Sequence, residues 1–225
     1  MDRAMKLYQE ALAIKKEQLG EAHDEVANTQ NNVAHLLFTL GRDEECLEAY
    51  NEVLRMRKNK FGPDHLAVAT TQSNIGDLHV KMENPRAAVE AFQESVRIRK
   101  LQEDSSPADV SRALDSLAST CGNLGAWDQA CDAYKETLAL KKRAYGGQHE
   151  EIIKALDLLA MTLIEQSHFM EATQPVKEAL ELRRRRFGNE HPEVVSQINA
   201  LAFLYKKAGD EAKAKSVLSE ITPQA

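Results

Sequence analysis

Four histidines occur at a regular spacing along the chain: His23, His65, His149 and His191, separated by 42, 84 and 42 residues. Imidazole nitrogens are common zinc ligands, so a histidine series could indicate a metal site. Zinc ligands must all lie about 2 Å from one ion, whereas equivalent residues of neighbouring helical repeats are separated by at least a helix diameter, about 10 Å. We therefore expect no metal site, and expect each histidine to accept a hydrogen bond from free N–H groups at the start of a helix.

Two aspartates, Asp115 and Asp157, also lie 42 residues apart and could act as paired carboxylates. Glycoside hydrolysis needs two carboxylates about 5–9.5 Å apart, one of them with a raised pKa. No apolar pocket that would raise a carboxyl pKa is apparent around them, and the chain has no Gly-rich phosphate loop, Gly-X-Ser-X-Gly or Cys-His-Asn pattern. We predict that the protein is not an enzyme, needs no cofactor, and uses these aspartates as an acidic spot for a basic or polar peptide.

The composition narrows the class of protein. The chain has 225 residues with 29 Lys+Arg against 35 Asp+Glu, a net charge of −6, which gives no reason to expect nucleic acid as a partner. Aromatic residues make up only 5%, with 10 Gly and 6 Pro, and this profile favours helices over a β-rich, collagen-like or disordered chain. Three cysteines cannot build a disulfide framework, which favours a cytoplasmic location. The longest apolar run, residues 158–164, is far shorter than the roughly 20 residues of a membrane span.

The histidine spacing belongs to a 42-residue repeat that covers the chain without a gap. Rows beginning at residues 23, 65, 107, 149 and 191 align, and we number the positions of each row from 1 to 42. Apolar residues recur three and four residues apart in two stretches of each row, which indicates two helices. Glycines such as Gly41 at position 19 and Gly62 at position 40 mark the breaks after them. Position 12 is always small: Ala34, Gly76, Ala118, Ala160 and Ala202.

We therefore predict an all-α fold, an α-solenoid whose core is created by stacking helix hairpins. The predicted domain organisation is a single array: a partial repeat over 1–22, full repeats over 23–64, 65–106, 107–148 and 149–190, and a shortened terminal repeat over 191–225. Two departures from the pattern carry expectations of their own. Pro175 inside a second helix should kink or shorten that helix, and the linker 103–107, without the usual aromatic residue and histidine, should give a looser joint.

These columns resemble the tetratricopeptide (TPR) pattern, which has large, apolar, small and aromatic residues in the first helix and alanine, aromatic and small residues in the second. The linkers 61–65 (Phe-Gly-Pro-Asp-His) and 187–191 (Phe-Gly-Asn-Glu-His), together with Asn31-Asn32, are similar to the kinesin-light-chain type of TPR. The resemblance implies a right-handed superhelix of helix pairs whose first helices line a concave groove. In that family, first-helix asparagines hold the backbone of the ligand, and Asn31, Asn32 and Asn74 match those positions.

The resemblance and the polar stripe on the first helices predict a non-catalytic protein–protein interaction scaffold that binds an extended peptide segment of a partner. Asn and Ser side chains both donate and accept hydrogen bonds, which suits a peptide backbone. Cargo or adaptor binding, as in kinesin light chains, is the closest role that the resemblance implies. The predicted groove residues are Asn28, Asn31, Asn32, His35, Ser73, Asn74, Asp77, Arg112, Asp115, Lys154, Asp157, Met161, Asn199 and Phe203.

Two alternatives stay open. The cations of the groove could pair along their own helices, Arg112 with Asp115 and Lys154 with Asp157, instead of meeting a ligand. The chain could also be a structural or sensor solenoid module of a larger protein, because it begins inside a second helix and would leave one side of that helix unpaired. Its apolar residues could pack on the first row or support self-association through an open N-terminal face: Leu7, Tyr8, Leu12 and Ile14.

Overall fold

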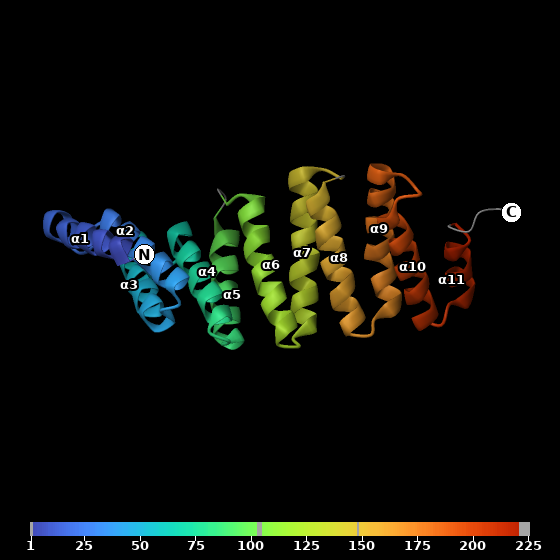
Figure 1. Cartoon of the computed structure of the whole chain (residues 1–225), viewed down its shortest axis with the longest axis horizontal. Coiled ribbons are helices and arrows are strands. Elements are labelled where there is room, and N and C mark those ends of the chain that lie inside the picture. The colour runs from blue at the N-terminus through green and yellow to red at the C-terminus, as the bar shows by residue number, and fades with distance from the viewer. Residues whose placement is uncertain (1, 103–104, 148, 221–225) are drawn as a thin grey trace. The chain divides into compact units, whose positions relative to one another are not determined.

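The computed structural model describes residues 2–102, 105–147 and 149–220, and over these ranges it contains eleven helices and no strand (Figure 1). This confirms the predicted all-α solenoid fold. The first helices of the rows are α2, α4, α6, α8 and α10, and the remaining six are second helices. The helices are α1 (Asp2–Leu19), α2 (Asp24–Leu40), α3 (Asp43–Phe61), α4 (Leu66–Lys81), α5 (Pro85–Leu101), α6 (Pro107–Asn123), α7 (Trp127–Tyr145), α8 (Glu150–Glu165), α9 (Phe169–Phe187), α10 (Pro192–Lys207) and α11 (Glu211–Leu218).

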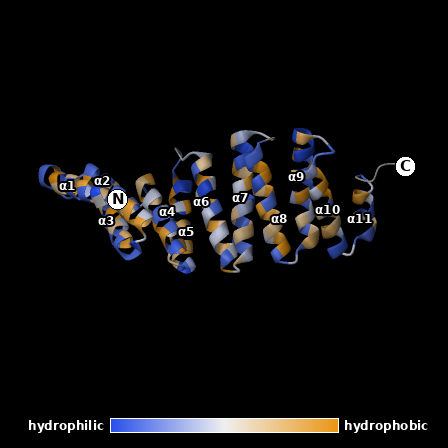
Figure 2. Ribbon diagram, in the orientation of Figure 1, coloured by the Kyte–Doolittle hydropathy of each residue, from blue (hydrophilic) through white to orange (hydrophobic). Residues whose placement is uncertain are grey.

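The helices group into two compact units, Met1–Thr120 and Cys121–Ala225, with the boundary in the last turn of α6. In the first unit, each helix from α1 to α4 contacts the next helix along the chain, and the same is true of α7 to α10 in the second unit. Hydrophobic and hydrophilic residues alternate around the helices (Figure 2), as expected when each helix buries one side against its neighbours. Each unit therefore has a core that consists of successive helix–helix layers.

Small residues let the paired helices approach closely. Cys46 of α3 is fully buried and its thiol donates a 3.1 Å hydrogen bond to the carbonyl of Ala34 on α2. In the next hairpin, a Cβ added to Gly76 of α4 would lie 2.6 Å from the ring of Phe92 on α5, which itself is 1% exposed. Gly76 thus leaves space for a buried aromatic ring. A larger side chain at residue 76 would force the two helices apart.

The turn between the two helices of a row has one backbone conformation throughout. Gly41, at position 19, adopts φ 73° and ends α2, and the N–H of the following Arg42 bonds to the carbonyl of Leu37 at 3.1 Å. Glu83 and Ser167 occupy position 19 in their rows and also have positive φ, 55° and 60°. A left-handed conformation costs non-glycine residues about 1–2 kcal/mol. The packing of the hairpin therefore imposes this turn even where the sequence does not favour it.

The histidines at position 1 act as helix N-caps, as predicted. The N–H of Glu25 donates to His23 Nδ1 at 3.2 Å, and His65, His149 and His191 accept equivalent bonds at 3.1–3.3 Å. In three joints the imidazole also stacks on an aromatic ring four residues earlier, with centroids 4.4–4.5 Å apart: Phe61 on His65, Tyr145 on His149 and Phe187 on His191.

The joint before α6 uses a different cap, because Pro107 stands at position 1. Ser106 accepts a hydrogen bond from the N–H of Asp109 at 3.1 Å and donates to the Asp109 carboxylate at 2.7 Å, so a serine replaces the histidine one residue earlier. Two residues of this linker, 103 and 104, lie outside the described residues. The looser joint expected here stays a prediction.

The expected shortening of α9 at Pro175 was wrong, because α9 continues through this residue over 19 residues, the same length as α3 and α7. The expected kink stays a prediction. On α1, Leu7, Tyr8 and Ile14 are exposed, and Met5 and Leu12 make the apolar contacts with the core instead. The reason is that α1 packs mainly against α2, whereas its equivalent α3 lies between α2 and α4.

Candidate functional site

The fourteen predicted groove residues all lie on first helices, and none of them is buried. The positions beside them in the repeat form the core, since Val26, Val33 and Ala34 of α2 are at most 7% exposed. The first helices therefore present a polar side that is separate from their packing side. Seven residues lie on α2 and α4, two on α6 and five on α8 and α10, in the order Asn28, Asn31, Asn32, His35; Ser73, Asn74, Asp77; Arg112, Asp115; Lys154, Asp157, Met161; Asn199, Phe203.

In the first unit, amide side chains connect neighbouring first helices. Asn74 Nδ2 of α4 donates to Asn31 Oδ1 of α2 over 3.5 Å, a long hydrogen bond that places the two amides side by side. Asn32 and His35 of α2 are exposed beside them. Each amide carries both a donor and an acceptor, so this stretch can match the alternating N–H and C=O groups of an extended peptide.

Asp77 adds a carboxylate to this stretch of α4. Its side chain reaches solvent, yet the surrounding protein desolvates it and raises its pKa. Burial also raises the pKa of Tyr50 to about 12, with smaller contributions from Cys46 and Asp77. One turn beyond, Lys81 Nζ lies 2.6 Å from Asp43 and 4.7 Å from the centroid of the Phe38 ring. The first unit thus combines amides, an acid with a raised pKa and a lysine that is already paired.

Arg57 was not among the predicted groove residues, although its side chain extends from α3 to residues of α2 and α4. Its Nη2 donates to Asn28 Oδ1 at 3.1 Å, and its Nη1 donates to Thr71 Oγ1 at 2.8 Å and to the carbonyl of Ala67 at 3.1 Å. Only 8% of the residue is exposed. The repeat contained a signal for it, since position 35 is cationic in the partial repeat 1–22 and in all four full repeats: Lys15, Arg57, Arg99, Lys141 and Arg183.

The proposed pairing of groove cations along their own helices was wrong for Lys154. Arg112 lies 3.1 Å from Asp109, one turn before it on α6. Lys154 pairs with Glu151 at 3.1 Å and Glu150 at 3.4 Å instead of Asp157. Acidic residues gather in the first turn of each of these helices, where they also interact favourably with the helix dipole.

Asp157 is bound across the hairpin by Arg183 of α9. The guanidinium makes two hydrogen bonds to the carboxylate, at 2.6 and 3.1 Å, and a third of 3.4 Å to Glu193 of α10. This network raises the pKa of Arg183, mainly through the bond to Asp157. The carboxylate of Asp157 is therefore already bound within the chain. Residues 183–186 are four consecutive arginines, and this run is partly engaged in ion pairs within the chain.

In the second unit, apolar residues take the place of the amides. Met161 of α8 and Phe203 of α10 share position 13 and are 62% and 51% exposed, and Leu158, one turn before Met161, is 37% exposed. Lys207 lies 5.5 Å from the Phe203 ring centroid. Exposed large apolar side chains on the first helices of neighbouring hairpins can accept the apolar side chains of a peptide.

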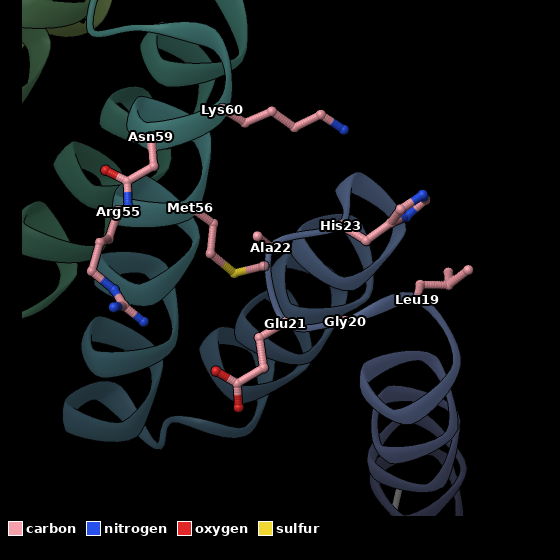
Figure 3. A pocket seen from close by; sticks show the side chains of 9 residues that line it. All are labelled: Leu19, Gly20, Glu21, Ala22, His23, Arg55, Met56, Asn59 and Lys60. Atoms are coloured by element: carbon pink, nitrogen blue, oxygen red, sulfur yellow. The ribbon is translucent and has the colours of Figure 1, made fainter.

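A crevice of about 650 Å³ opens where the α1–α2 loop meets the end of α3 (Figure 3). Met56 points across it towards Ala22, while Lys60 extends away into solvent. A smaller crevice of about 400 Å³ has residues at matching repeat positions, including His149, Leu182 and Arg186 in place of His23, Met56 and Lys60. The crevice thus recurs at two joints between rows. Its lining is Leu19, Gly20, Glu21, Ala22, His23, Arg55, Met56, Asn59 and Lys60.

Over the described ranges, no three His, Cys, Asp or Glu side chains are grouped so that they could hold a metal ion. The three cysteines are free and buried, and burial raises the pKa of Cys46 to about 11. No helix in the described part of the chain combines the length and apolar character needed to cross a membrane. The chemistry available on the first helices is therefore hydrogen bonding, charge pairing and apolar contact.

Comparison with known proteins adds the family context. A family model described as "Tetratricopeptide repeat" matches residues 1–58, 25–100 and 109–185, which together make up more than half of the chain. No curated protein sequence matches the chain.

Several solved structures share this fold. A kinesin-light-chain-type protein of Podosopora anserina with nearly identical TPR-like repeats is 17% identical with a TM-score of 0.68, and the match covers 88% of this chain and 94% of that one. BtubC (BKLC) from P. vanneervenii is 19% identical with a TM-score of 0.67 and coverages of 97% and 88%. MamA is 15% identical with a TM-score of 0.61 and coverages of 90% and 91%. The similarity to kinesin-light-chain-like repeats extends over nearly the whole chain.

Proposed function

Because this chain belongs to the tetratricopeptide repeat family, we propose that it is a non-catalytic scaffold that binds an extended peptide segment of a partner protein along its first helices. Members of the family use such repeats for protein–protein interaction. The kinesin-light-chain-like repeats favour a cargo or adaptor protein as the source of the segment.

One observation carries the proposal: the same few positions of the repeat stay accessible on successive first helices while their neighbours are buried. Asn32 and His35 on α2 are exposed beside the buried residues Val33 and Ala34, and Asp77 on α4 is exposed beside the fully buried Leu78. A repeated row of accessible side chains matches a ligand that is itself regular, and an extended peptide is such a ligand.

The two units would contribute different chemistry. The amides of α2 and α4 offer hydrogen bonds to a peptide backbone, which give affinity with little dependence on sequence. Met161 and Phe203 in the second unit offer contacts for apolar side chains, which discriminate between sequences. A partner segment is therefore expected to contain one stretch that is bound through its backbone. A second stretch is expected to carry apolar side chains that contact Met161 and Phe203.

Peptide selection tests the proposal. A library of acetylated, amidated ten-residue peptides is selected on the chain, and affinities are measured for Asn32→Asp on α2 and Met161→Ser on α8. Each change is matched by a control on a second helix with an exposed residue of the same type, Asn51→Asp on α3 and Met170→Ser on α9. We expect peptides that bind the controls normally and lose affinity for at least one groove variant.

An absence of enriched peptides would contradict the proposal. So would enriched peptides that bind both groove variants as tightly as the unmodified chain. Circular dichroism of all four variants shows whether the helices are intact, so that a loss of binding can be assigned to the surface.

Self-association through α1 is a second candidate, favoured by exposed apolar residues on one helix. Leu7 is 57% exposed, Ile14 53%, Leu19 41% and Tyr8 37%. The test is light scattering over a range of concentrations, with the double variant Leu7→Lys and Ile14→Lys. Leu101→Lys on α5 removes an equally exposed leucine, 58%, as the control. Association that persists in the double variant, or none in the unmodified chain, would exclude this role.

A further inference from the structure

The joint before α2 lacks the aromatic residue that the other histidine-capped joints contain. In those three joints a ring at position 39 stacks on the capping imidazole, as Tyr145 does on His149 with centroids 4.4 Å apart. His23 caps its helix in the same way, since it accepts the N–H of Glu25 at 3.2 Å, but position 39 holds Leu19. Leucine has no planar ring, so the imidazole of His23 has no stacked partner within the described part of the chain.

The crevice at this joint extends to the linker, whereas the equivalent crevice at the joint before α8 does not. The larger one, of about 650 Å³, is lined by residues 19–21 as well as by His23. The counterparts of these linker residues, 145–147, do not line the smaller crevice of about 400 Å³. The stacked ring of Tyr145 therefore closes the linker side of its joint, and Leu19 leaves the same side of the first joint open.

The base of the larger crevice is apolar. Met56 is only 9% exposed and belongs to a small core cluster with Val26 and Ala27. Its side chain points across the crevice towards Ala22 (Figure 3). A thioether adapts to irregular spaces and makes favourable contacts with aromatic rings, with the sulfur about 5 Å from the ring. The base of the crevice therefore suits a flat apolar group.

The mouth of the crevice adds polar groups that suit the same kind of ligand. Arg55 and Asn59 lie one turn apart on α3 and are both exposed beside it. A guanidinium is attracted to the face of an aromatic ring, and an amide oxygen can accept a hydrogen bond from an indole N–H or a phenol O–H. Imidazole, thioether, guanidinium and amide thus surround a space that opens to solvent.

We propose that this crevice binds an aromatic side chain of a partner protein, with its ring stacked on His23 as Tyr145 is stacked on His149. The occupant follows from the chain itself, because three of its joints hold such a ring on the capping imidazole at 4.4–4.5 Å. Aromatic side chains that enter a pocket often anchor protein interfaces, since they bring a large apolar area at a small cost in conformational entropy. The site is additional to the proposed groove, because none of the fourteen predicted groove residues lines the crevice.

The decisive variant is Leu19→Phe, which gives the first joint the residue type of the other joints. Its ring should stack on His23 and close the linker side of the crevice. We therefore expect a higher melting temperature together with a loss of the binding site. The control is Leu101→Phe, which places the same residue at an exposed site before the joint that is capped by Ser106, and which should have neither effect.

Peptide selection supplies the ligand. Acetylated, amidated ten-residue peptides are first passed over the Leu19→Phe variant, which removes those that bind elsewhere, and are then selected on the unmodified chain. We expect the selected peptides to share one Trp, Tyr or Phe, and replacing that residue with Leu should weaken binding about tenfold. His23→Asn keeps an N-cap and removes the stacking surface, so it should weaken binding about two- to tenfold.

Methionine methyl groups show where the selected peptides bind. Met56 lies in the crevice, whereas Met161 lies on α8 among the predicted groove residues. In a chain labelled at its methionine methyl groups, a ring in the crevice should shift the nuclear magnetic resonance signal of Met56 and leave that of Met161 in place. Met56→Leu identifies the first signal, and circular dichroism shows whether each variant keeps its helices.

Several outcomes would refute the proposal. These are a selection that yields no peptide, selected peptides without a shared aromatic residue, and aromatic peptides that shift the Met161 signal alone, which would support the first-helix groove instead. Light scattering of the unmodified chain completes the test. Self-association that Leu19→Phe abolishes and Leu101→Phe retains would assign the crevice to a second copy of the chain, and would also refute the proposal.

Discussion

The ring of Phe61 stacks on the imidazole of His65, with centroids 4.5 Å apart and planes inclined by 18°. The same histidine accepts a hydrogen bond from the N–H of Ala67 through Nδ1. One residue therefore caps α4 and holds the end of α3 against it. The first joint has the cap without the stack, because Leu19 stands where the aromatic residue would be.

A double-mutant cycle of Phe61→Leu and His65→Asn measures this relationship. Asparagine is a good N-cap, so His65→Asn removes the stack and keeps the cap. We expect a coupling of about 0.5–1.5 kcal/mol, the usual range for an aromatic pair. The measurement is urea unfolding of the four proteins. Additive effects of the two changes would show that the stack contributes no stability.

Glu83→Gly should stabilise the chain, because residue 83 has a φ of 55° that glycine adopts without strain. The expected gain in the free energy of unfolding is about 0.5–1 kcal/mol, after the greater flexibility of glycine in the unfolded state is subtracted. Glu90→Gly makes the same change at an exposed site within α5 and should cost about 1 kcal/mol. Urea unfolding of both variants would contradict this account if the two effects had the same sign.

Asp77→Asn should stabilise the chain at neutral pH. The folded state raises the pKa of Asp77, so it holds the proton more tightly than the unfolded state does and loses stability as the carboxyl ionises. This penalty is absent well below the unfolded pKa of about 3.9 and is complete above the folded pKa. Urea unfolding of the two proteins should therefore show the stabilisation at pH 7 and its decrease towards pH 3.

The thiol of Cys46 should resist alkylation in the folded chain. Its pKa of about 11 lowers the thiolate fraction at pH 8 by about 100-fold relative to a model thiol, and the residue is fully buried. Mass spectrometry after iodoacetamide treatment should show little modification of Cys46 in the native protein and rapid modification in urea. Rapid native modification would indicate that the α2–α3 hairpin opens readily.

The sequence was sufficient to predict the fold because each repeat position has a single packing role. Small residues at position 12 indicate close helix packing, and histidines at position 1 indicate N-caps. The structure shows both. The continuous course of α9 through Pro175 was not predictable from local preference. Neighbouring helices pack along both sides of α9, and this packing outweighs the single hydrogen bond that proline removes.

The sequence predicts which residues lie at the candidate site better than it predicts which contacts these residues make. Periodicity places Asp157 and Lys154 on one side of α8, but it does not show that Arg183, 26 residues later, reaches Asp157 from the next helix. Arg57 was overlooked for a related reason. A cation near the end of a second helix also interacts favourably with the helix dipole, so its place in the sequence does not indicate a contact with the first helices, which only the three-dimensional structure shows.

Under the proposed peptide binding, the different surfaces of α2 and α4 in the first unit and of α8 and α10 in the second have a consequence for affinity. A partner that occupies only the amide surface or only the Met161 and Phe203 surface gains a fraction of the available binding energy, whereas a partner that carries both matching stretches on one chain makes the second contact at a high effective concentration. The spacing between the two stretches of the partner then becomes a determinant of selectivity in its own right. Two proteins with identical short motifs would be distinguished by the length of chain that joins them.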